Sequence, residues 1–114
     1  MRTLKYASQT FVTTDEMAHV IIEFTAEMAK SEDSEAVTLP TVDEEGRVVE
    51  IDIVVGPASE VISTPADDRP SEIDTTVAVA EIERRIGALK SARDRTAYPL
   101  DEGGPATSFD DLTV

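Results

Sequence analysis

The chain has 114 residues, with 24 acidic residues against 10 basic ones and no cysteine. That length suits a single domain, because domains cluster near about 100–150 residues. Without cysteine the chain forms no disulfide, no thiolate zinc site and no thiol nucleophile. A net charge of −14 argues against a nucleic-acid backbone or an anionic membrane as a direct partner.

The N-terminal third predicts a strand followed by a helix. Residues 3–12 alternate between apolar and polar side chains with a polar break in the middle, which predicts one interrupted strand. Thr13 and Glu16 then have the spacing of a capping box, and we expect a helix over 14–31. Its apolar residues recur at steps of three and four, as in a helix with one buried face: Met17, Ile21, Phe24 and Met28.

The middle of the chain predicts a hairpin. Residues 37–41 alternate as a strand, and Pro40 favours a position at the sheet edge because proline has no N–H to donate. The acidic segment 43–46 indicates a turn in which Gly46 takes positive φ. Residues 48–55 are the clearest strand, and one set of alternate side chains belongs to the core: Val49, Ile51, Ile53 and Val55.

The last third predicts a short strand and a long helix. Residues 60–64 suit a fourth strand, and Ser71 opens a capping signature for a helix over 71–93. Gly87 lies within this helix, where it indicates a close packing contact. The elements predict an α+β fold of order β-α-β-β-β-α, in which a small antiparallel sheet of 3–4 strands carries two helices on one face. We expect one domain over 1–93 and a flexible acidic tail over 94–114.

The outward side of the strand over 48–55 is the first candidate surface. Its side chains are Val48, Glu50, Asp52 and Val54. Glu50 and Asp52 lie about 7 Å apart, which suits a hard cation or an acid–base pair. Val48 and Val54 instead favour a partner surface with a charged centre. A solvated polar face is the commoner alternative, because alternating strands expose polar residues by default.

His19 is the sole histidine and the one candidate for acid–base chemistry. Asp15 and Glu23 stand four residues to either side of it, where a helix brings side chains together. A carboxylate-oriented histidine can act as a general base, but the sequence offers no nucleophile beside it. A surface histidine is the simpler interpretation, and the expectation is that no residue is catalytic and no cofactor or metal is bound.

Charge is unevenly distributed along the chain. Between Asp15 and Glu83 there are 19 acidic residues and three basic ones. A basic stripe follows, which we expect to compensate the second helix dipole and pair with Glu81 and Glu83: Arg84, Arg85, Lys90, Arg93 and Arg95. Near the end of the chain, Phe109 and Leu112 flank two aspartates, a pattern that docks into basic apolar grooves or remains an unstructured end.

Short motifs in the chain resemble a family of small uncharacterised actinobacterial proteins. The matching segments are L-K-Y-A-S at 4–8, D-E-M-A-H-V at 15–20 and R-P-S-E at 69–72. The resemblance spans about residues 2–90 and departs at Ala7, where the family has glycine, at Met17, where it has leucine, and in lacking tryptophan. Members often carry an ATP-dependent DNA ligase label, but the lysine motif of that activity is absent here. The resemblance therefore implies source and fold and no activity.

These observations favour a non-enzymatic, cytoplasmic interaction module that self-associates. The contact is either the sheet face that carries Val48 and Val54 or an edge pairing through the strand over 48–55 or the strand over 60–64. The chain has no phosphate-binding loop, no nucleophile motif and no leader or membrane-spanning pattern. One alternative is an acidic regulatory protein that binds a basic partner protein by charge. Another is a small metal-assisted enzyme that uses Glu50, Asp52 and His19.

Overall fold

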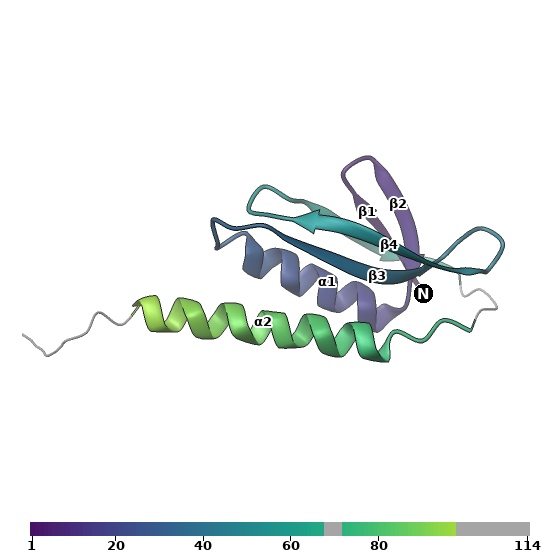
Figure 1. Cartoon of the computed structure of the whole chain (residues 1–114). Helices are drawn as coiled ribbons and strands as arrows, with labels where there is room; N and C mark the ends of the chain where they lie inside the picture. Colours follow the sequence, from purple (N-terminus) through teal and green to yellow (C-terminus); the bar gives the residue numbers. More distant parts are fainter. Residues whose placement is uncertain (68–71, 98–114) are drawn as a thin grey trace, which may run out of the picture.

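The protein folds as a five-stranded antiparallel sheet with two helices, in the order β-β-α-β-β-β-α (Figure 1). The computed structural model describes residues 1–67 and 72–97. The strands are β1 (Arg2–Tyr6), β2 (Gln9–Thr13), β3 (Glu35–Val42), β4 (Val48–Val55) and β5 (Val61–Pro65), and the helices are α1 (Asp15–Met28) and α2 (Thr76–Ala97). The strands lie in the order β4-β3-β2-β1-β5, so β4 and β5 form the two edges of the sheet.

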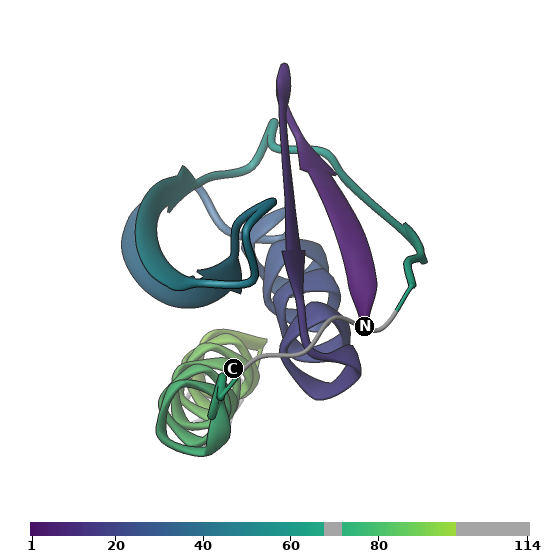
Figure 2. The ribbon, with the colours of Figure 1, turned by 90° about the vertical axis from the view of Figure 1, so that its right-hand side faces the viewer.

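Both helices cover the same side of the curved sheet, as predicted (Figure 2). Helix α1 packs against β1 and β5, and α2 packs against α1 and β3. The two helices run side by side in the same direction, because the hydroxyls of Thr14 and Thr75 bond at 2.8 Å at one end and Arg93 binds Glu27 at the other. The shared core confirms the predicted apolar stripe, with Met17, Ile21, Phe24 and Met28 fully buried.

The prediction of three to four strands was wrong at the N-terminus. Residues 3–12 are not one interrupted strand but two antiparallel strands, with Tyr6 paired to Gln9 across a two-residue turn. Ala7 supplies the turn with a φ of 56°. Glycine and asparagine are the usual residues at such positions, so an alanine there gives no recognisable turn signal.

The start of α1 also differs from the capping-box prediction. Thr14, not Thr13, caps the helix, and its side chain accepts a hydrogen bond of 3.1 Å from the Met17 N–H. Thr13 is instead the buried last residue of β2, where its hydroxyl donates to the Pro40 carbonyl at 2.9 Å. Either of the two consecutive threonines could cap the helix by its sequence position. Thr13 belongs to β2, so Thr14 is the cap.

Helix α2 starts later and ends later than the predicted 71–93. The Asp74 carboxylate accepts from the Thr76 N–H at 2.9 Å, which satisfies one of the N–H groups that the first turn of the helix leaves unpaired. This backbone hydrogen bond holds the pKa of Asp74 below its usual value. The Thr75 carbonyl accepts the first helical bond from Val79, and the helix then continues to Ala97, beyond the expected domain boundary. Residues 98–114 of the predicted tail lie outside the described residues.

Pro40 does not lie in an edge strand, contrary to expectation, because β3 is second from the edge. Its position is nevertheless locally open, since β2 and β3 pair only at Val12 and Val42. The missing proline N–H points to the side where β2 has already ended. Side chains supply hydrogen-bond donors to β3 where β2 does not pair with it. Thr13 donates to the Pro40 carbonyl and Arg85 donates to the Ala36 carbonyl, both at 2.9 Å.

Candidate interaction surface

Strand β4 alternates between inward and outward side chains, and its outward side is the predicted surface. Val48 and Val54 are 47% and 62% exposed, and Glu50 and Asp52 are exposed between them. The inward set behaves as predicted at Ile51, Ile53 and Val55. Val49 was expected in the core but is 42% exposed, because it lies near the hairpin turn, beyond the part of the sheet that the helices cover.

The backbone of β4 points every second residue's N–H and C=O away from β3, toward the open edge of the sheet. Asp43 N–H donates to the Arg47 carbonyl, which makes this residue pair a hydrogen-bonded pair of the hairpin. Because such pairs recur at every second residue, the odd-numbered residues of β4 bond to β3 and the even-numbered ones face outward. The outward groups belong to the same four residues that carry the outward side chains: Val48, Glu50, Asp52 and Val54.

Tyr6 closes one end of this edge, a role that sequence reasoning missed. Its hydroxyl, at the end of β1, donates to the Val54 carbonyl and lies 2.8 Å from the Ser59 hydroxyl. An open hollow of about 740 Å³ lies around this contact, with Val54 and the 58% exposed Ile62 in its wall. Tyr6 was assigned only to a strand, since nothing in its local pattern indicates a contact 48 residues away.

The two carboxylates of the surface have different surroundings. Asp52 accepts a hydrogen bond of 2.5 Å from the Thr38 hydroxyl on the neighbouring strand. Glu50 lies opposite Pro40, which offers no side-chain donor. Within the described residues, no group of three or more histidine, cysteine or acidic side chains could hold a metal ion.

His19 lies apart from these carboxylates. It projects from α1 on the helix-covered side of the sheet, whereas Glu50 and Asp52 belong to the outward side of β4. Its side chain is 76% exposed, and its Nε2 lies 3.8 Å from a Glu23 oxygen. His19 and Ser63 line one shallow hollow of about 340 Å³. The Ser63 hydroxyl accepts a hydrogen bond of 2.9 Å from the Arg2 guanidinium. The structure thus does not bring together the three residues of the metal-enzyme alternative.

The basic stripe of α2 forms ion pairs, as predicted, although with different partners in part. Arg84 and Arg85 both bind Glu81, which lowers the pKa of that carboxyl to about 2. Arg93 reaches across to Glu27 of α1. Glu27 is buried, and its hydrogen bond to Arg93, with Lys30 nearby, lowers its pKa.

The remaining predicted surface residues, Phe109 and Leu112, lie outside the described residues, as does the side chain of Arg95. Over the part of the chain that is described, no helix is both long and apolar enough to span a membrane. Comparisons with protein-family models, curated proteins and solved structures found no match. The resemblance to small actinobacterial proteins therefore stays a prediction.

Proposed function

We propose that this protein is a non-enzymatic interaction module that self-associates through the edge strand β4. The observation that carries the proposal is the coincidence of exposed valines and outward backbone groups on the same strand. An edge strand with free N–H and C=O groups is a template for pairing with another strand. A second copy of β4 offers the same groups in the same pattern, so a two-fold symmetric pair satisfies both copies.

The outward residues define the register of such a pair. Antiparallel pairing centred on Ile51 places Val48 opposite Val54 of the partner subunit and leaves all the outward groups in hydrogen-bonding positions. The Val54 carbonyl can accept this bond while it keeps Tyr6, because a carbonyl oxygen has two lone pairs. The sheet would then continue from one copy to the other.

The contact is small, so we expect weak association. Fully burying a valine side chain contributes about 1.5–3 kcal/mol, and only the exposed half or so of Val48 and Val54 remains to be buried. Association costs at least about 4 kcal/mol in lost translational and rotational freedom. These two terms nearly cancel, so the net affinity has to come from the backbone hydrogen bonds of the pair, which contribute about 0.5–1.5 kcal/mol each.

Charge at the centre of the surface distinguishes this proposal from binding of a basic partner. The same register places Glu50 opposite Asp52 of the partner subunit, about 5 Å apart, where like charges repel. Salt screens this repulsion, since the Debye length falls from about 10 Å at 0.1 M to 3 Å at 1 M. Self-association should therefore strengthen with salt, whereas an acidic module bound to a basic partner protein would dissociate.

The test is sedimentation equilibrium of the full chain with a matched pair of variants. Glu50→Pro removes the Glu50 charge together with its outward N–H and breaks no hydrogen bond to β3, so the fold should tolerate it and association should be lost. Glu50→Ala keeps the N–H and removes a repulsive charge, so it should associate at least as well as the wild type. Equal association of both variants, or a monomeric wild type at millimolar concentration and high salt, would refute the proposal.

A further inference from the structure

A groove between α2 and the start of β3 combines apolar walls with two guanidinium groups. Its volume is about 510 Å³, and its lining comes from two elements far apart in sequence: Glu35 and Ala36 on β3, and Arg84, Arg85, Ala88, Leu89 and Ala92 on α2. Leu89 is half-buried at its base, and Ala36 and Ala88 are exposed. Because the alanine side chains beside the partly covered Leu89 are small, the groove has room for a large apolar side chain.

Both arginines of the groove keep a terminal nitrogen available. Arg84 uses Nε and Nη2 on Glu81, and no bond from its Nη1 occurs within the described residues. Arg85 donates from Nε to Glu81 and from Nη1 to both Glu35 and the Ala36 carbonyl. Its Nη2 likewise makes no hydrogen bond within the described residues. These ion pairs fix the guanidinium planes, and the remaining N–H groups can each bind a further carboxylate.

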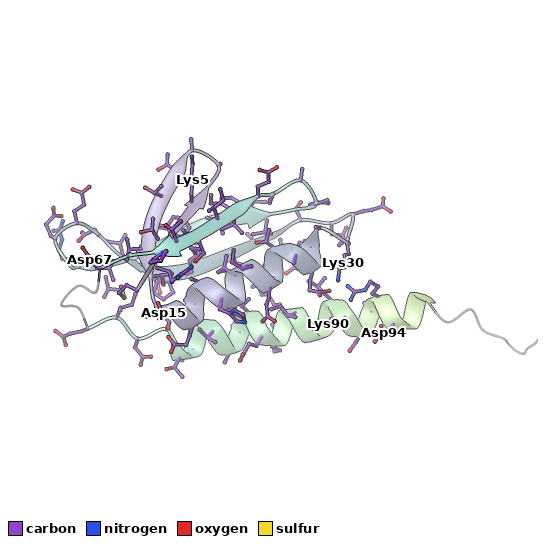
Figure 3. All side chains as sticks on the ribbon, turned by 180° about the vertical axis from the view of Figure 1, so that it is seen from behind. Lys5, Asp15, Lys30, Asp67, Lys90 and Asp94 are labelled. Atoms are coloured by element: carbon purple, nitrogen blue, oxygen red, sulfur yellow. The ribbon has the colours of Figure 1, made fainter. Side chains whose placement is uncertain are left out.

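The chain itself contains a segment with the matching chemistry. Phe109 and Leu112 supply two large apolar side chains, and Asp110 and Asp111 between them supply two carboxylates. The body of the protein is strongly acidic, whereas at the groove Arg84 and Arg85 balance the charges of Glu81 and Glu35, so an acidic segment meets less repulsion there than over the acidic body. Figure 3 shows Lys90 and Asp94 on the C-terminal half of α2.

The length of the connection fits this groove. From Ala97 to Phe109 the chain has 12 residues, which can span at most about 40 Å. Back along the helix, Arg85 lies about 18 Å from Ala97 at the rise of an α-helix. The connection is therefore long enough to reach the groove, and because it joins segment and groove in one chain, it raises their effective concentration.

We propose that the segment Phe109-Asp110-Asp111-Leu112 docks into the α2–β3 groove of its own chain, with its carboxylates on Arg84 and Arg85. The groove does not include β4, so this inference stands or falls independently of self-association. Docking would cover the apolar wall formed by Ala36, Ala88 and Leu89. A partner that carries a similar acidic and apolar segment would then have to displace the tail.

Paramagnetic relaxation enhancement in the full-length chain tests this directly. The chain lacks cysteine, so Ser108→Cys gives a single attachment point for a nitroxide beside the docking segment. We expect loss of amide signal at Ala36, Ala88 and Leu89 relative to the reduced, diamagnetic sample. An isotope-labelled chain without the nitroxide, mixed with unlabelled nitroxide-bearing chain, should lose no signal.

Two variants make the result specific. Ala88→Glu places a carboxylate in the groove and should restore the lost signals, whereas Ser91→Glu adds the same charge to an exposed position of α2 outside the lining and should not. Replacing Phe109 and Leu112 by serine should also restore them. Signals unaffected by the nitroxide, signal loss that survives the Phe109 and Leu112 replacements, or a comparable loss in the mixed sample would each overturn docking within the chain.

Discussion

The ion pair between Glu27 and Arg93 gives the sharpest stability prediction, because it joins the two helices at a buried position. The Glu27 side chain is only 10% exposed and accepts from Arg93, while the Lys30 ammonium lies 3.5 Å from its other oxygen. A hydrogen bond to a charged group contributes about 1.5–3 kcal/mol, and an exposed pair such as that with Lys30 adds under about 1 kcal/mol. We expect Glu27→Gln to lower the free energy of unfolding by about 2 kcal/mol.

Urea unfolding followed by far-UV circular dichroism measures this loss. The control is Glu23→Gln on the same helix, because Glu23 is half exposed and its recorded partner is His19 at 3.8 Å. We expect the control to change stability by less than about 0.5 kcal/mol. Equal losses from the two substitutions would refute the reasoning, since the Glu27 pair would then contribute no more than a surface contact.

The pH dependence of the Glu27→Gln effect follows from the lowered pKa of Glu27. The folded state holds this carboxyl ionised more strongly than the unfolded chain does, so the contribution is complete at neutral pH. It is lost as the pH falls below the ordinary glutamate value of 4.5 and through the lowered pKa. The difference between wild type and Glu27→Gln should therefore shrink in acid, and a constant difference would contradict the assignment.

Three further substitutions test single features by the same unfolding assay. Gly87→Ala should stabilise by about 1 kcal/mol, because a methyl group there meets no atom within 4 Å and alanine favours the helix; a loss would show that the site is packed. Thr14→Ala should cost about 1–2 kcal/mol through loss of the α1 cap and its bond to Thr75, and no change would disprove the cap. Tyr6→Phe should cost about 1 kcal/mol, and an unchanged stability would mean that its hydroxyl contact with Val54 contributes nothing.

The sequence predicts well those elements whose pattern is local. The apolar repeat of α1, the acidic turn before Arg47 and the alternation of β4 each depend on neighbouring residues, and the structure confirms them. Gly46 takes a φ of 80°, as its place in the turn required. The outward set of β4 could be named for the same reason, since alternation alone decides which side chains share a face.

The features that failed depend on contacts distant in sequence or on unusual backbone conformations. The first hairpin was missed because Ala7 takes the positive φ that glycine normally signals. The burial of Glu27 has no local signal, because its partner Arg93 lies 66 residues away on the other helix. Gly87 suggested a close contact, but open space surrounds it, so its identity has no packing reason in this structure.

Amide hydrogen exchange along β4 tests self-association most directly. The amides of Val49 and Ile51 bond to β3 within one copy, so their protection should not depend on concentration. The amides of Val48, Glu50 and Asp52 face outward, and edge pairing predicts that their protection rises as the protein is concentrated to roughly millimolar. Outward amides that exchange at the same rate at every concentration would contradict the central claim that β4 joins two copies of the chain.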